Sequence, residues 1–282
     1  MTKTKNTGEN STPRYRTIWI SDVHLGTAGC KAGQLAAFLK ATDCEKLYLV
    51  GDIIDGWQLR KQFYWPQEHS NVIRRVLTKS KRGAQVCYVA GNHDEFLRKF
   101  VGYELSLGNI GLVNEAVHVT ADGRRLLVIH GDQFDVITRY HRWLAVAGDT
   151  AYTATMNASY WLNKGRSLFG LPYWSLSAFA KRHVKTAVNV ISDFEQSVAR
   201  ECRRRGFDGV VCGHIHHAEI RPMDGITYYN CGDWVESCTA LAEDMSGNIS
   251  VLHWGVDAPL AATSEPAFAR RSANVIEFPV AA

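Results

Sequence analysis

The sequence predicts an α/β fold built as a two-sheet sandwich. Short apolar runs rich in β-branched and aromatic residues alternate with helical patterns over the first 90 residues, which is typical of parallel strands in an α/β layer. Further along the chain, Asx-Gly pairs separate runs of alternating character and predict antiparallel hairpins. Because the chain combines both kinds of strand pairing, we expect a two-sheet α/β sandwich.

Four segments have the composition of buried strands. They are residues 15–21, 46–50, 85–90 and 207–212. Helical patterns lie between the first three, at residues 33–41 and 67–80. Strands that are joined through helices pair in parallel, so these elements should form one α/β layer.

Three turns predict the antiparallel part of the fold. The first two are Asp122-Gly123, between residues 115–120 and 124–130, and Asp224-Gly225, between residues 218–222 and 226–230. The third is at Ser246-Gly247-Asn248. An Asx-Gly pair between alternating runs is the strongest short-range signal for a hairpin.

The chain should divide into one domain, an insertion and two tails. Residues 1–13 are polar and lack the apolar core of a signal peptide, so we expect a disordered tail. Residues 14–256 form the predicted domain. Within it, residues 136–190 carry few strand signals and many aromatic residues, which indicates a helical insertion. Residues 257–282 are Ala-rich and weakly patterned, so a loose C-terminal tail is expected.

Bulk composition excludes some classes of protein. The net charge of +4 gives no sign of a dedicated nucleic-acid binder. The seven cysteines form no Cys-x-x-Cys pair, which favours reduced thiols and a cytoplasmic chain. No run of about 18 apolar residues is present, so we expect no membrane-spanning helix, although the chain could lie on a membrane surface. The oligomeric state is not predicted.

Metal-ligating side chains follow the predicted strands in five short motifs. The motifs are Asp22-Val23-His24, Gly51-Asp52-Ile53-Ile54-Asp55, Gly91-Asn92-His93-Asp94, His130-Gly131-Asp132 and Gly213-His214-Ile215-His216. Ligands in open α/β sheets bind at the carboxyl ends of strands, because the loops converge there. Any one of these motifs could be an ordinary turn, but their joint occurrence predicts a metal centre.

The donor set indicates which metals could bind. The candidate ligands are Asp22, His24, Asp52, Asn92, His130, His214 and His216. Oxygen and imidazole donors without thiolate suit Mn²⁺, Fe or Zn²⁺ better than a soft metal. We expect two divalent metal ions, of which Mn²⁺ is the first candidate. Two such ions side by side are a device for cleaving phosphate esters.

The order of these motifs resembles that of the calcineurin-like metallophosphoesterases over roughly residues 16–255. The resemblance implies a two-sheet metallophosphoesterase sandwich flanked by helices, with the helical insertion over the active-site edge, and a dinuclear metal site. It also implies the partition of the ligands. Asp22, His24, Asp52 and His216 would hold one metal, and Asp52 would bridge to a second metal held by Asn92, His130 and His214.

The resemblance gives His93 and Asp55 a catalytic role. His93 would lie beside the phosphoryl group, where it either stabilises negative charge or protonates the leaving oxygen. Asp55 would orient His93 and keep it cationic. The simpler interpretation of His93 is a structural histidine in a turn.

The insertion suggests an amphiphilic substrate. Between residues 139 and 185 it carries seven basic residues and one acidic residue, Asp149, among many aromatic residues. Such a surface suits anionic head groups and acyl chains, and would allow peripheral association with an anionic membrane on its inner face. The other interpretation is a helical cap that packs its aromatic side chains into a core of its own.

Within the family, the chain looks most like the UDP-2,3-diacylglucosamine diphosphatases, which implies release of UMP from a lipid-linked substrate. It departs from them at His93, where those enzymes typically have Arg. A histidine can donate a proton, which leaves room for a phospholipase C-type hydrolase of glycerophospholipids. A soluble phosphodiesterase is the second alternative. A non-enzymatic binding module is not favoured, because every ligand position is intact.

Overall fold

The computed structural model describes residues 12–102, 110–134, 191–255 and 261–264. The chain divides into two compact units, residues 1–131 with 202–282 and residues 132–201. The first unit contains both sheets and every predicted site residue. The whole of the predicted insertion, residues 136–190, lies outside the described residues, as do residues 1–11 of the predicted N-terminal tail and most of the predicted C-terminal tail.

The larger sheet has seven strands. Their order is β12 (Ala261–Ser264), β11 (Ile249–His253), β10 (Thr239–Glu243), β1 (Arg14–Ile20), β2 (Asp43–Val50), β3 (Gln85–Val89) and β4 (Ile110–Val113). From β1 to β4 the pairing is parallel, whereas β10, β11 and β12 extend the sheet beyond β1 by antiparallel pairing. The predicted α/β layer is therefore confirmed. Strand β12 lies in the segment expected to be a loose tail, so residues 261–264 depart from that expectation.

The smaller sheet has five strands. Their order is β5 (Glu115–Val119), β6 (Arg125–Ile129), β7 (Gly209–Cys212), β9 (Ile226–Asn230) and β8 (Glu219–Met223). β6, β7 and β9 are parallel, and the two edge strands pair antiparallel through the predicted hairpins. At the second hairpin turn, Asp224 and Gly225 both have positive φ, as a tight two-residue turn requires.

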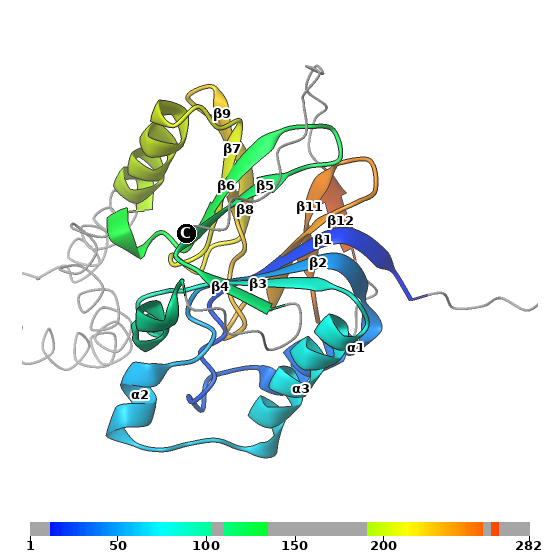
Figure 1. The fold of residues 1–282 in the computed structure, drawn as a ribbon, viewed down its shortest axis with the longest axis vertical. Helices are drawn as coiled ribbons and strands as arrows, with labels where there is room; N and C mark the ends of the chain where they lie inside the picture. The colour runs from blue at the N-terminus through cyan, green and yellow to red at the C-terminus, as the bar shows by residue number, and fades with distance from the viewer. Residues whose placement is uncertain (1–11, 103–109, 135–190, 256–260, 265–282) are drawn as a thin grey trace, which may run out of the picture. The chain divides into compact units, whose positions relative to one another are not determined.

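Helices lie on the outer face of the larger sheet (Figure 1). They are α1 (Ala32–Ala41) and α3 (Gln67–Lys81), which match the predicted segments. A shorter helix, α2 (Gly56–Lys61), lies between β2 and α3 along the chain and was not predicted. Short 3-10 helices follow β3 and β6, namely η1 (Glu95–Phe100) and η2 (Asp132–Phe134), and residues 191–204 form a further helix.

Alternation along the central strands divides the core into two layers. Ile18 and Ile20 of β1 pack with α1 and α3, whereas Trp19 between them faces the second sheet. On β2, Leu47 and Leu49 pack in the same layer as Ile18 and Ile20, on the side of α1 and α3. Successive side chains of a strand point to opposite faces, so both faces of this sheet are buried. Burial of both faces agrees with the short apolar runs from which the sequence predicted buried strands.

A buried ionic network joins the two sheets. Glu243 of β10 accepts from Arg16 Nη1 at 2.8 Å and from Thr17 Oγ1 at 2.8 Å, both on β1. His118 of β5, in the other sheet, lies with Nε2 2.9 Å from the same carboxylate. His118 and Glu243 are fully buried, so both need polar partners, and their mutual contact is the shortest that His118 makes.

This network predicts an acid-labile fold. Burial alone would raise the pKa of Glu243, but the hydrogen bonds from His118 and Thr17 outweigh it, so the pKa lies below its ordinary value. Burial lowers the pKa of His118. Both groups therefore bind protons more readily when unfolded, and stability should fall as the pH drops below about 6.5 and again below about 4.3.

Glu243→Ala should destabilise the protein by about 3 kcal/mol at neutral pH, because it leaves Arg16 and His118 without their shared acceptor. Urea unfolding at pH 8 and pH 5 measures both effects, and the variant should lose part of the pH dependence. Glu45→Ala is the matched control. It removes an exposed ion pair with Arg14, at 3.4 Å, and should cost less than about 1 kcal/mol. Equal losses for the two variants would show that the buried network is not stabilising.

Candidate metal centre

Each predicted site residue follows the carboxyl end of a strand. Asp22 and His24 follow β1, Asp52 and Asp55 follow β2, Asn92 and His93 follow β3, His130 follows β6, and His214 and His216 follow β7. The first three strands are parallel neighbours in one sheet, and β6 and β7 are parallel neighbours in the other. The carboxyl ends of both sets meet. The backbone N–H of His214 donates to Asp22 Oδ2 at 2.9 Å, across 192 positions of sequence.

One ligand cluster contains Asp22, His24 and His216, whose donor atoms lie within 4.8 Å of one another. His216 Nε2 is 3.2 Å from Asp22 Oδ1, and His24 Nε2 is 4.0 Å from the same oxygen. His24 Nε2 also lies 3.9 Å from Asp52 Oδ2. Carboxylate and imidazole donors at these separations can surround one divalent ion.

A second cluster contains Asp52, His130 and His214. His130 Nε2 is 3.4 Å from Asp52 Oδ2, 3.3 Å from Asn92 Oδ1 and 3.3 Å from His214 Nδ1. Asp52 therefore faces both clusters with the same oxygen, Oδ2, which is the arrangement that a bridging ligand requires.

The hydrogen-bond pattern of the second cluster calls for a cation. The carbonyl of Val50 can only accept, so the 3.0 Å contact with His130 Nδ1 places the ring proton on that nitrogen. On the neutral ring, Nε2 then presents a lone pair to the oxygens of Asp52 and Asn92. Acceptors that face one another are stabilised only by positive charge among them. A second proton, on Nε2, would form a hydrogen bond to only one of these oxygens at a time. A divalent ion could attract both oxygens and the Nε2 lone pair together.

Unsatisfied polar atoms support the same conclusion at the first cluster. Asp22 Oδ1, His24 Nε2 and Asp52 Oδ2 are buried and make no hydrogen bond with the described residues. A buried carboxylate oxygen without a partner costs free energy. The residues therefore fit divalent cations, and the ligands that the sequence predicted lie where they could hold them.

The carboxylates of the centre stay ionised. Burial would raise the pKa of Asp22 and of Asp52, but the neighbouring imidazoles outweigh it, chiefly His216 for Asp22 and His130 for Asp52. Both pKa values therefore lie well below the ordinary value. Two buried negative charges within one site attract cations strongly.

The backbone is bent to aim the ligands. Five of the seven described non-glycine residues with positive φ are predicted ligands: Asp22, His24, Asp52, His214 and His216. This conformation is uncommon for residues with a Cβ atom and tends to occur at functional sites. Hydrogen bonds hold it in place. His24 N donates to Asp52 O at 2.9 Å, and Asp22 N donates to Gly51 O at 3.2 Å, so the first two ligand loops pair with each other.

Two motif glycines make room for ligands. A Cβ atom on Gly91 would overlap the carboxylate of Asp52, and one on Gly51 would overlap the ring of His130. Gly51 also has a φ of +74°, a conformation that glycine adopts without strain. These glycines are therefore required by the ligands that pack against them, in addition to any role in turning the chain.

His93 and His24 share one carboxylate. Nδ1 of His93 lies 2.9 Å from Asp55 Oδ2, off the line of an ideal hydrogen bond, and Nδ1 of His24 lies 3.2 Å from the same oxygen. Burial would raise the pKa of Asp55, but these two imidazoles and the backbone N–H of Gln58 outweigh it, so the pKa is lowered. Asp55 therefore connects a predicted metal ligand with the predicted catalytic histidine. Nε2 of His93 is 4.0 Å from Asp52 Oδ2, so His93 faces the centre.

Two supporting residues were not found from the sequence. Asp94 is fully buried and ties the third ligand loop to the second, because its carboxylate accepts from Gly91 N at 2.5 Å and from Ile53 N at 2.9 Å. His69 supports the first loop, since its Nδ1 accepts from Gly26 N at 3.1 Å. The fourth residue of Gly-Asn-His-Asp was a visible signal for Asp94. His69 had no signal, because a single histidine on a helix is common.

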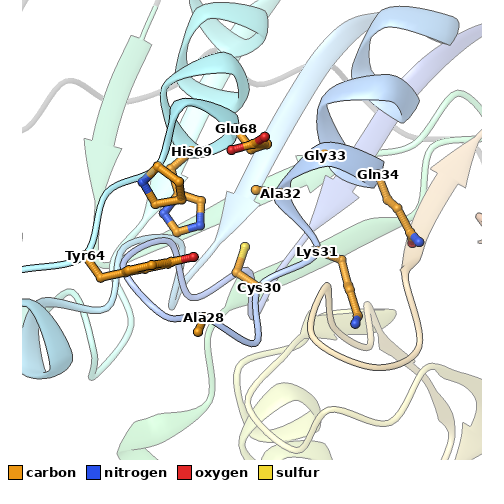
Figure 2. A pocket seen from close by; sticks show the side chains of 10 residues that line it. Ala28, Cys30, Lys31, Ala32, Gly33, Gln34, Tyr64, Glu68 and His69 are labelled. Carbon is orange, nitrogen blue, oxygen red and sulfur yellow. The ribbon is translucent and has the colours of Figure 1, made fainter.

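His69 also lines a hollow next to the first ligand loop (Figure 2). The hollow has a volume of about 290 Å³ and lies between residues 28–34 and the start of α3. Tyr64 and His69 border it on one side, and Cys30 and Lys31 border it on the other. None of the predicted ligands lines it, so it is distinct from the metal centre.

Comparison with known proteins identifies the family. The family model of the calcineurin-like phosphoesterases matches residues 15–218. The chain therefore belongs to the calcineurin-like phosphoesterase family and is a metal-dependent phosphoric ester hydrolase. Its seven-stranded and five-stranded sheets and its ligand clusters agree with that assignment.

Among individual proteins, the chain is similar to several UDP-2,3-diacylglucosamine hydrolases. It is 24% identical to that of Aliivibrio fischeri over 84% of this chain and 97% of the relative, and 24% identical to that of Neisseria meningitidis serogroup B over 77% and 88%. Among solved structures, Yfce, a phosphoesterase from E. coli, aligns over 88% of this chain and 98% of its own, with 15% identity and a TM-score of 0.43.

No helix among the described residues is long and apolar enough to cross a membrane.

Proposed function

We propose that this protein hydrolyses the phosphoanhydride bond of UDP-2,3-diacylglucosamine and releases UMP. The observation that carries the proposal is the similarity to hydrolases of that name over nearly their whole length. The ligand clusters around Asp52 support it, because they suit the cleavage of a phosphate bond. The basic, aromatic sequence of residues 139–185 supports an amphiphilic substrate.

In this mechanism the residues of the chain bind the metal ions, orient the catalytic histidine and protonate the leaving oxygen. One divalent ion would be held by Asp22, His24 and His216, and the other would be held by Asn92, His130 and His214. Asp52 would contribute to holding both ions. Such a pair of ions, of which we propose Mn²⁺, activates water for attack on phosphorus and neutralises the phosphoryl oxygens. Asp55 holds the ring of His93 toward the centre. His93 then stabilises negative charge on the phosphoryl group or gives its Nε2 proton to the leaving oxygen.

A second candidate follows from His93 itself. Its Nδ1 faces a carboxylate and its Nε2 faces the metal centre, which is the arrangement of a proton donor. An alcohol leaving group must be protonated as it departs, whereas a phosphate leaving group is less basic and depends less on a proton donor. This geometry therefore favours phospholipase C-type hydrolysis of glycerophospholipids as the alternative. In either case we place the activity in the cytoplasm, at the membrane surface that holds the lipid.

A substrate panel tests the proposal. Purified protein with Mn²⁺ in detergent is given UDP-2,3-diacylglucosamine, phosphatidylcholine and a soluble chromogenic phosphodiester, and mass spectrometry identifies the products. The proposal predicts UMP and a diacylated sugar phosphate as the fastest-formed products. Diacylglycerol and phosphocholine as the fastest-formed products would support the second candidate. Turnover of the soluble diester alone would overturn both lipid assignments.

A further inference from the structure

The indole ring of Trp57 lies directly against His93. The centroids of the two rings are 4.2 Å apart, with 38° between their planes. Trp57 is in the first turn of α2, two residues after Asp55, whose carboxylate contacts His93 Nδ1. The two residues therefore approach the same imidazole from one short segment.

Polar contacts hold Trp57 and its segment in place. The indole Nε1–H of Trp57 donates to Glu95 Oε1 at 3.2 Å, on η1, which lies next to α2 (Figure 1). Asp55 caps α2 by accepting from Gln58 N at 2.7 Å, and Gly56 N donates to His93 O at 2.9 Å. These contacts fix both the backbone of His93 and the position of the indole.

The imidazole of His93 is thus bounded on three sides. Asp55 lies at Nδ1, the indole of Trp57 lies against the ring, and the ring of His24 meets it edge-on at 4.6 Å and 89°. Nε2 is left facing Asp52. A rotation of the imidazole would require the indole to move, because aromatic rings at this separation are in van der Waals contact.

Core packing does not account for this placement. Trp57 belongs to neither of the two hydrophobic clusters formed by the described residues, whereas Trp19 and Trp234 are fully buried within them. Trp57 is half-buried, and its ring packs against that of His93. The placement of this large, half-exposed aromatic side chain is therefore explained by its contact with His93 and not by packing in the core.

We propose that Trp57 is a positioning residue for His93. Anchored by Glu95, it holds the imidazole in the one orientation in which Nδ1 meets Asp55 and Nε2 faces the metal centre, and it excludes water from that face of the ring. The inference rests on the proposed role of His93. Since an aromatic contact of this kind changes a conformational equilibrium by about tenfold at most, Trp57→Ala should lower kcat roughly tenfold.

A double-mutant cycle tests the inference. Trp57→Ala should lower kcat with an alkyl leaving group, with little change in KM and with the metal content unaltered. In a His93→Ala background the same substitution should have no further effect, because the residue through which Trp57 acts is gone. Trp57→Phe keeps an aromatic contact and should retain most of the activity. An equal loss in both backgrounds, or a Trp57→Phe variant as poor as Trp57→Ala, would overturn the proposal.

A matched control and a second variant secure the test. Trp254→Ala removes another half-buried indole, whose ring meets that of Phe38 at 5.6 Å and does not contact His93, and should leave kcat unchanged. If Trp57→Ala does not fold, Glu95→Ala removes the indole's anchor instead. It should give a smaller loss that also vanishes in the His93→Ala background.

A readout without activity separates this inference from the proposed function. The readout is the NMR spectrum of isotopically histidine-labelled protein, in which the ring signals of His93 are assigned by their absence from His93→Ala. These signals should shift strongly in Trp57→Ala, because the ring current of the indole is lost. Unchanged His93 signals would contradict the contact whatever the enzyme hydrolyses. A wild-type protein inactive on every phosphate ester, with His93 signals that do shift, would sink the proposed function and leave the positioning contact standing.

Discussion

Asp52→Asn is expected to lower kcat by on the order of 10³-fold or more. Asp52 Oδ2 is the atom that faces both ligand clusters, at 3.9 Å from His24 Nε2 and 3.4 Å from His130 Nε2. Asparagine keeps the size of the side chain but removes the charge between the two cation positions. Turnover of a soluble phosphodiester at saturating Mn²⁺ measures the loss.

Asp43→Asn is the matched control for this prediction. Asp43 begins the same strand, β2, at the end away from the metal centre, and its side chain is about half exposed. The control should keep its activity. Near-normal turnover by Asp52→Asn at saturating metal would count against a bridging role.

His93→Ala should lower kcat by about 10²- to 10⁴-fold while the protein still binds two metal ions. His93 faces the centre through Nε2 and Asp55 through Nδ1, as a residue that donates a proton to the leaving oxygen should. The loss should therefore be larger for an alkyl ester than for a nitrophenyl ester, whose leaving group needs less protonation. Kinetics with the two esters, together with metal analysis of the same sample, measure both quantities.

The structure leaves a definite alternative for His93. Its ring lies within 4.8 Å of donor atoms of His24 and Asp52, so these three residues could also surround an ion. If His93→Ala loses metal in proportion to its activity, His93 is a ligand and the proton-donor role is wrong.

Much of the fold could be predicted from the sequence because its signals are local. The runs that end β1 and β2 and form most of β3 are short and apolar, and Asp224-Gly225 has the backbone conformation that the turn demands. The missed elements are short or depend on distant partners. α2 has six residues, and β12 exists through its pairing with β11. No local pattern marks either.

The gathering of the candidate ligands could also be predicted, because each motif follows a strand, and their role as metal ligands stays a prediction. The residues that support them could not be predicted. The shared contact of His24 and His93 with Asp55 joins three loops, and the pairing of His118 with Glu243 spans 125 positions. Such contacts arise only when both sheets are assembled. For the same reason, nothing in the sequence showed that Trp57 would lie on His93.

The central claim is that Asp52 lies between two divalent ions, and anomalous diffraction tests it most directly. Crystals of the protein soaked in Mn²⁺ are measured near the manganese absorption edge. Two anomalous peaks are expected, one within ligand distance of Asp22, His24 and His216 and one within ligand distance of Asn92, His130 and His214, both adjacent to Asp52. Asp52→Asn crystals should show weaker or missing peaks. No peak, or a single peak away from Asp52 in the wild-type crystals, would contradict the account.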